Sequence, residues 1–259
     1  MMSGDSEVII KVKGVNKYFS TSSGILEVLK NVNLEVRRKS FLTFIGPSGC
    51  GKSTLLSMIG GLVRPSDGEI YIENIKAEGP RPDKIAMVFQ DPALLPWRTV
   101  MGNVEFGLEI RGIPKKERRD IAQKYIDLVG LSKFEDYFPT QLSGGMRQRV
   151  AIARALAVEP EILLMDEPFA NLDEQSRLLL GIDLVRIWQR TGKTIVFVTH
   201  SIQEAALLST EIALFTRRPG TIKEVVKIDT GHPRSIEDDN VVKLRKYVWD
   251  KLREEIVSR

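Results

Sequence analysis

Short apolar runs recur along the chain with the pattern of β-strands that are buried on both faces. They are "FLTFIG" (41–46), "IAMVFQ" (85–90), "EILLMD" (161–166) and "TIVFVTH" (194–200), with "EIALF" (211–215) as a weaker candidate. Stretches with helical spacing separate these runs. This alternation predicts an α/β fold with a mostly parallel sheet.

A different pattern occupies the beginning of the chain. The segments "EVIIKVKGVNKYF" (7–19), "NVNLEV" (31–36) and "GEIYIEN" (68–74) alternate apolar and polar residues, which is typical of half-buried strands. Because these segments lie close together in the sequence, they predict a small antiparallel β layer beside the parallel sheet.

The stretch from Pro92 to about Val150 has helical spacing and no buried-strand run, so we interpret it as an inserted helical subdomain. Near the end, Leu244, Val248, Leu252 and Ile256 repeat at one helical turn, an apolar stripe that favours docking on the core over contact with lipid. The expected organisation is one α/β domain over 1–235 (core 1–91 and 151–235, helical subdomain 92–150) and a C-terminal helix over 236–259.

Composition narrows the class of protein. Of 259 residues, 42% are hydrophobic and 28% charged, which indicates a globular chain. The net charge of +4 is small and forms no basic block, so it does not favour nucleic-acid binding. No signal peptide or membrane-spanning run is expected, and a single cysteine excludes an internal disulfide. These features predict a cytoplasmic location.

The first candidate site is "GPSGCGKST", in which Gly46, Gly51, Lys52 and Ser53 match G-x-x-x-x-G-K-[ST]. It follows a predicted strand and precedes a predicted helix, as the motif requires. The glycines let backbone N–H groups surround a phosphate, the lysine reaches the β/γ oxygens, and the serine hydroxyl can ligate Mg²⁺. The expected nucleotide contacts are Gly46, Pro47, Ser48, Gly49, Cys50, Gly51, Lys52, Ser53 and Thr54.

Cys50 lies inside this loop, next to a helix start. It could simply be a small residue that fits. A thiol at a helix N-terminus has a lowered pKa, however, which predicts reaction with a thiol reagent that bound ATP would slow.

Polar residues at the ends of other predicted strands complete the expected chemistry. Asp166 is suited to hold Mg²⁺, and its neighbour Glu167 to accept a proton from the attacking water. His200 could hydrogen-bond the γ-phosphate, and Gln90 could reach Mg²⁺ or the water. Each residue alone has a structural alternative, such as a solvated turn or a strand-end histidine. Their combination with the phosphate loop favours a site.

A second Ser-Gly-Gly turn, in "LSGGMRQRV" (142–150), also leads into a predicted helix. Taken in order, "GPSGCGKST", "VFQ", "LSGGMRQRVAIARAL", "ILLMDEP", "NLD" and "VTH" resemble the ATP-binding subunit of ABC transporters over about 8–228. The resemblance implies a P-loop NTPase fold of the RecA-like type, with ATP and Mg²⁺ as cofactors. It also implies ATPase activity coupled to transmembrane transport.

The resemblance further implies that two such chains pair head to tail. The Ser143, Gly144, Gly145 and Met146 turn of one chain would then contact the ATP held in the phosphate loop of the other. Asp173 matches the loop that crosses the dimer interface, and Phe19 the aromatic residue that stacks on adenine, with Tyr18 as a substitute. The chain departs from the common pattern at Ala170–Asn171, where Ser-Ala is more frequent, at Met146, where many members have glutamine, and at Ser201, where aspartate is frequent.

"LLPWRTVMGNV" (94–104), "RIWQRTGKTIVFVTHSIQEAALLS" (186–209) and "RRPGTI" (217–222) are most similar to the nitrate/sulfonate/taurine-type importer branch. This implies partner permease subunits, an extracytoplasmic solute-binding protein, and a peripheral position on the inner face of the membrane. Gln90 would sense the γ-phosphate and move the adjoining loop with Leu94, Leu95, Pro96 and Trp97, which would meet the permease or instead cap the subdomain's own core. The alternative functions are an ATPase acting on nucleic acid or ribosomes, and a scaffold that binds nucleotide without hydrolysis.

Overall fold

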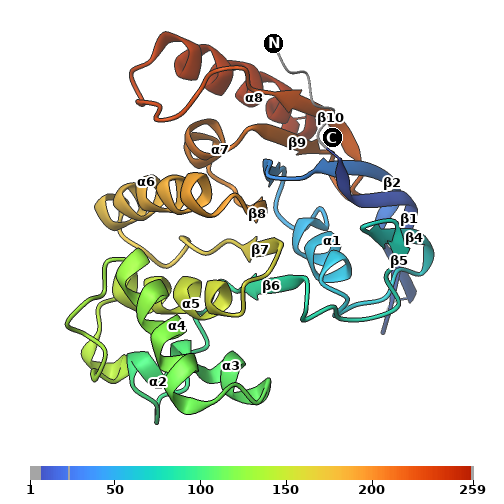
Figure 1. Cartoon of the computed structure of the whole chain (residues 1–259). Helices are drawn as coiled ribbons and strands as arrows, with labels where there is room; N and C mark the ends of the chain where they lie inside the picture. The colour runs from blue at the N-terminus through green and yellow to red at the C-terminus, as the bar shows by residue number, and fades with distance from the viewer. Residues whose placement is uncertain (1–6, 23, 258–259) are drawn as a thin grey trace. The chain divides into compact units, whose positions relative to one another are not determined.

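The computed structural model describes residues 7–22 and 24–257 (Figure 1). The described residues form two compact units, one within 1–81 and 193–259 and the other from residues 82–192. We call them unit 1 and unit 2 and describe each by itself.

Unit 1 contains the predicted antiparallel layer. β1 (Val8–Thr21) pairs with β2 (Gly24–Arg37) on one side and with β4 (Asp67–Ile72) on the other, and the short β5 (Ile75–Lys76) follows at the edge. β1 and β2 are longer than the predicted segments and bury alternate residues along much of their length, so one face of the layer packs inward.

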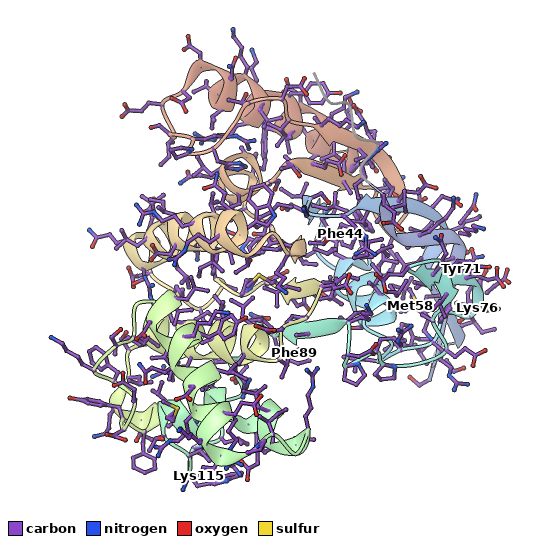
Figure 2. The ribbon with its side chains drawn as sticks, in the orientation of Figure 1. Phe44, Met58, Tyr71, Lys76, Phe89 and Lys115 are labelled. Carbon is purple, nitrogen blue, oxygen red and sulfur yellow. The ribbon has the colours of Figure 1, made fainter. Side chains whose placement is uncertain are left out.

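The phosphate-loop strand lies in the second sheet of unit 1, where strands follow the order β10-β9-β3-β8. β3 (Phe41–Ile45) is parallel to both β8 (Thr194–Val198) and β9 (Glu211–Phe215), and every residue of β3 and β8 is buried. Phe44 of β3, labelled in Figure 2, contacts Phe215 at 5.2 Å between ring centres. The antiparallel strand β10 (Ile222–Lys227) was not among the predicted strands.

The helices that accompany these sheets in the described part of unit 1 are α1 (Lys52–Ile59), α7 (Ile202–Leu208) and α8 (Asp239–Val257). Val248 and Leu252 of α8 pack with Ile45, Ile212 and Leu214, and Leu244 joins them at the margin. The apolar stripe therefore docks on the core, as predicted; the side chain of Ile256 lies outside the described residues.

Unit 2 combines a parallel strand pair with helices. β6 (Ile85–Val88) pairs with β7 (Ile162–Asp166). The helical region has the following elements: α2 (Val100–Val104), α3 (Phe106–Ile110), α4 (Lys115–Leu128), the 3-10 turn η1 (Pro139–Gln141) and α5 (Gly144–Ala157), with α6 (Glu174–Thr191) after β7. Among the described residues, no helix is long and apolar enough to cross a bilayer.

Candidate functional site

The loop from Gly46 to Lys52 connects β3 to α1 and has the backbone of a phosphate cradle. Gly49 and Gly51 adopt φ values of 72° and 103°, which glycine reaches without the Cβ clash of other residues. Ser48, Gly49 and Ser53 are exposed, whereas the other side of the loop is buried. The loop therefore presents its small residues to solvent, where a ligand could approach the backbone.

Lys52 places a positive charge on this loop although its side chain is almost fully buried. Its ammonium donates hydrogen bonds of 2.9 Å to the carbonyls of Gly46 and Pro47, which compensates for the loss of water. A cation held on a glycine-rich loop at a helix start fits a polyphosphate. The residues present thus fit the phosphates of ATP.

The structure corrects the sequence prediction that Cys50 has a reactive thiol with a lowered pKa. The residue is only 1% exposed, and burial raises the pKa of its thiol despite the opposing effect of Lys52. A helix N-terminus lowers a thiol pKa where the sulfur remains solvated, and here the packing against the loop removes the solvent. Cys50 is therefore a small buried residue and not a reactive one.

His200 lies at the same sheet edge as the phosphate loop. Phe44 is opposite Val198 in the parallel pairing of β3 with β8. Gly46 and His200 therefore each lie two residues beyond this matched pair. The hydroxyl of Thr199 accepts the N–H of Ser201 and donates to Glu204, which orders the turn around the exposed histidine. Unit 1 thus brings the loop and His200 to one edge.

Gln90 and the acid pair are brought together in the same way in unit 2. Val88 is opposite Met165 in the pairing of β6 with β7, so Gln90 and Glu167 both lie two residues beyond that pair. Phe89, labelled in Figure 2, and Gln90 are exposed where β6 ends. Glu167 has φ 43°, a strained value for a residue other than glycine, and such strain concentrates at functional sites.

The predicted magnesium ligands are divided between the units. Ser53 belongs to unit 1, and Gln90 and Asp166 belong to unit 2. Among residues 7–22 and 24–257 there is no group of three or more His, Cys, Asp or Glu suited to a metal. A hydroxyl, an amide and one carboxylate fit Mg²⁺, which usually takes few protein ligands and completes its shell with water and substrate phosphate.

The second Ser-Gly-Gly turn forms the N-terminus of α5 in unit 2. Ser143 is the N-cap: its hydroxyl accepts the N–H of Met146 at 3.3 Å, and its side chain is exposed. A methyl group added to Gly144 would lie 3.4 Å from Leu172, and one added to Gly145 would lie 3.9 Å from Ser176. The start of α5 therefore lies against the start of α6.

Asp173 caps that neighbouring helix. Its carboxylate accepts the N–H of Ser176 at 2.9 Å. Hydrogen bonding from the Ser176 side chain, and then from its backbone, holds the pKa of Asp173 below its usual value. Two helix N-termini, each with a partial positive charge, thus meet at one surface of unit 2. The structure brings together Ser143, Gly144, Gly145 and Asp173 at this surface.

The two candidate adenine-stacking residues lie on β1. The rings of Tyr18 and Phe19 are 41% and 39% exposed, so accessibility does not distinguish them. The ammonium of Lys17 lies 4.8 Å from the centre of the Phe19 ring. Phe19 is thereby held as part of a cationic and aromatic surface.

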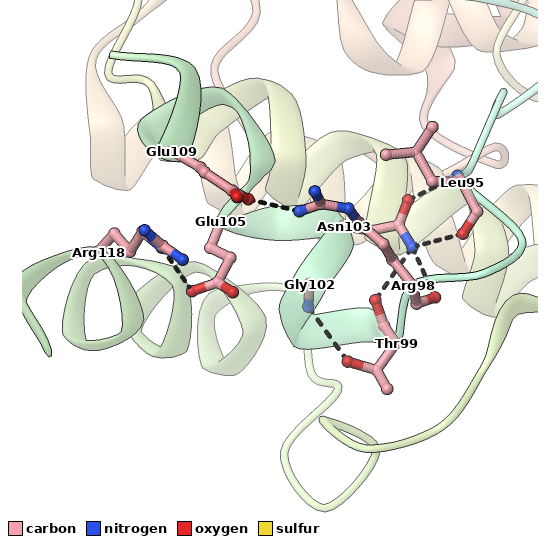
Figure 3. Close-up of polar contacts among 8 residues, drawn as sticks. All are labelled: Leu95, Arg98, Thr99, Gly102, Asn103, Glu105, Glu109 and Arg118. Atoms are coloured by element: carbon pink, nitrogen blue, oxygen red, sulfur yellow. Dashed lines mark hydrogen bonds and ion pairs between the residues drawn. The ribbon is translucent and has the colours of Figure 1, made fainter. Parts of the chain in front are cut away.

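The loop after Gln90 is held by a residue that sequence reasoning missed, Asn103 of α2. Its buried amide accepts the N–H of Leu95 at 2.8 Å and donates to the carbonyls of Leu95, Arg98 and Thr99 (Figure 3). The signal in the sequence was an asparagine inside the otherwise apolar "VMGNV" (100–104). Trp97, within this fixed loop, is 71% exposed and so does not cap the subdomain's core.

A phosphate loop, a strand-end acid pair and a Ser-Gly-Gly helix start on an α/β fold define a P-loop ATPase of the cassette type. The family model described as "ABC transporter" matches residues 29–170, and the chain belongs to that family. It is an ATPase that binds ATP and is coupled to transport. The recognition of the family and the predicted fold class are confirmed.

Similar proteins indicate which branch of the family this chain most resembles. The chain is 41% identical to the nitrate import ATP-binding protein NrtD of Synechocystis over 92% of this chain and 89% of the relative. It is 44% identical to the taurine import ATP-binding protein TauB of Yersinia pseudotuberculosis, over 86% and 91% respectively. A dimeric ATP-binding cassette bound to ADP and Pi shares 37% identity at a TM-score of 0.76, covering 86% of this chain and all of that one. The predicted resemblance to the nitrate/taurine branch is confirmed, and the nucleic-acid alternative has no support.

Proposed function

We propose that this chain energises the import of a small solute, such as nitrate, a sulfonate, taurine or a related nutrient, by hydrolysing ATP at sites shared between two copies. The observation that carries the shared site is the exposed Ser143 turn at the paired starts of α5 and α6, a second place suited to anionic oxygen besides the phosphate loop. The dimeric form of a similar cassette supports the same arrangement.

In the proposed site, Lys52 and the loop N–H groups bind the β- and γ-phosphates. Ser53, Gln90 and Asp166 would hold Mg²⁺, which neutralises phosphate charge when bound. Glu167 accepts the proton of the attacking water, and His200 hydrogen-bonds the γ-phosphate. Ser143, Gly144, Gly145 and Met146 of the second copy close over the terminal phosphate, and Asp173 lies at the interface.

A mixing experiment tests the shared site. Lys52→Ala removes the phosphate-loop cation, and Ser143→Arg blocks the second turn, so each variant alone should be inactive. In a mixed dimer, the loop of the Ser143→Arg chain and the turn of the Lys52→Ala chain form one intact site. Equimolar mixing should therefore restore ATPase activity in a fraction of the dimers, whereas a site within one chain would leave every mixture inactive.

The proposed partners are those that the nitrate/taurine-type importer branch implies. They are a second ATPase subunit, permease subunits and an extracytoplasmic solute-binding protein, which would place the chain at the inner face of the cell membrane. We propose the exposed loop around Trp97 as the surface that meets the permease, with Gln90 relaying the state of the nucleotide. The domain boundaries remain the proposed ones, 1–235 for the ATPase domain with the helical subdomain at 92–150, and 236–259 for the C-terminal helix.

A further inference from the structure

The turn between β9 and β10 contains "RRPGT" (217–221), a motif to which the proposed function assigns no role. Thr216 and Thr221 close the turn: the N–H of Thr216 donates to the carbonyl of Thr221, and the N–H of Thr221 to the hydroxyl of Thr216, both at 3.0 Å. Arg217, Arg218 and Pro219 are exposed, but Gly220 is buried. The turn therefore directs one glycine inward.

Gly220 is fastened to β2 by its own backbone. Its N–H donates to the carbonyl of Val28 at 2.8 Å, and its carbonyl accepts the N–H of Lys30 at 3.0 Å. These bonds enclose Leu29, which is fully buried. The same leucine supports the phosphate loop, because a methyl group added to Gly51 would lie 2.5 Å from its side chain.

Gly220 also contacts the phosphate loop directly. A methyl group added to it would lie 1.9 Å from the carbonyl oxygen of Cys50, far inside van der Waals contact. Gly220 is not among the glycines with positive φ, so its backbone conformation does not require glycine. The approach to Cys50 is therefore what excludes a side chain.

A second contact holds the other end of the loop. A methyl group added to Gly46 would lie 2.7 Å from Cβ of Phe215, the last residue of β9. The end of β9 and the following turn thus contact the phosphate loop at both Gly46 and Cys50. Side chains could not be added at either contact without moving the loop.

We propose that Gly220 is a positioning residue for the phosphate-binding loop, a role that rests on the proposed ATP site. In a trans peptide the carbonyl and the next N–H point in opposite directions. Because the Cys50 carbonyl rests against Gly220, the N–H of Gly51 points away from the turn, toward the side where phosphate binds. The turn thus fixes an N–H donor before the nucleotide arrives, which reduces the reorganisation that binding would otherwise require.

The test compares Gly220→Ala with Gly231→Ala in the purified full-length chain. Gly231 has no atom within 4 Å of an added methyl group and no positive φ, so it is a matched control. In Gly220→Ala the displaced Cys50 peptide should lose one charge-assisted hydrogen bond to phosphate. The dissociation constants of ATP and ADP should rise about tenfold or more, and those of Gly231→Ala should stay unchanged.

AMP, which lacks the β-phosphate, separates positioning from general destabilisation. Weaker binding of ATP and ADP with unchanged AMP binding supports the proposal. Unchanged ATP and ADP binding, or equal weakening of all three nucleotides, overturns it. If the wild-type chain binds no ATP, the proposed function fails instead.

Thr216→Val provides a second variant in case Gly220→Ala does not fold. It removes the hydroxyl that accepts the N–H of Thr221 and adds no atom near Cys50. Loosening the turn should weaken ATP and ADP binding about threefold, as expected for a partly lost neutral hydrogen bond, and leave AMP unaffected. No change in ATP and ADP binding by a folded Thr216→Val protein counts against the proposal.

Discussion

At the residue scale, Glu167 joins a proposed chemical role to a strained backbone. Its φ of 43° lies in the left-handed region, and its carbonyl accepts the N–H of Ala170 at 3.1 Å in the turn after β7. A glutamate in this conformation costs stability that a glycine would not. The strain persists because the turn must place a carboxylate directly after the strand.

This strain predicts that two substitutions of Glu167 differ in their effect on stability. Glu167→Gly should raise the free energy of unfolding by about 1 kcal/mol, whereas Glu167→Gln keeps the strain and should leave it nearly unchanged. Both should abolish ATP hydrolysis if Glu167 is the general base. Denaturant unfolding and phosphate release measure the two properties. Equal stability of the two variants would contradict the strain argument. Full activity of Glu167→Gln would contradict the proposed role of Glu167 as the general base.

At the scale of elements, the sequence predicted the buried strands and their polar ends, because apolar runs bounded by turn residues are a local signal. It did not predict which strands are neighbours. The opposition of Val88 to Met165, which aligns Gln90 with Glu167, comes from long-range pairing that no local pattern contains. The contact of Gly220 with Cys50 was invisible for the same reason.

The loop of Trp97 provides a prediction at this scale. The Asn103 amide fixes the loop backbone, so Trp97→Ala should remove an exposed ring without unfolding the loop. If the ring packs into the permease, its loss should cost about 2 kcal/mol or more of docking energy. Transport by the reconstituted system should therefore fall at least tenfold, while the ATPase activity of the isolated chain stays unchanged.

Ile110→Ala is the matched control, because Ile110 is 72% exposed in the same unit but lies at the end of α3, outside the loop. It should leave transport near the wild-type rate. Equal transport by wild type and Trp97→Ala would reject this loop as the coupling surface.

At the scale of the whole molecule, the sequence predicted the fold class and the antiparallel layer, but not how the C-terminal segment is secured. Arg234 donates hydrogen bonds to the carbonyls of Ala206, Ser209 and Thr230, and so ties the segment before α8 to the end of α7. These bonds use backbone carbonyls, which have no sequence signature. The neighbouring His232 is half-buried in the same segment.

His232 makes the stability of the molecule depend on pH. Burial, with the nearby charge of Arg234, lowers the pKa of His232 from 6.5 to about 4. Between these values the unfolded chain binds a proton that the folded chain does not, so stability is full above pH 6.5 and falls as the pH drops toward 4. The expected loss at pH 5 is about 1–2 kcal/mol.

The measurement is favourable because the chain has only two histidines, and His200 is exposed. Urea unfolding should give a lower free energy of unfolding at pH 5 than at pH 7. The substitution His232→Asn should reduce this difference, whereas His200→Asn should leave it unchanged. A difference that persists in His232→Asn would assign the acid sensitivity to other groups. Since Arg234 is fixed by three carbonyls, its charge cannot move away from a protonated His232. The segment between β10 and α8 should therefore be the first part of unit 1 to open in acid.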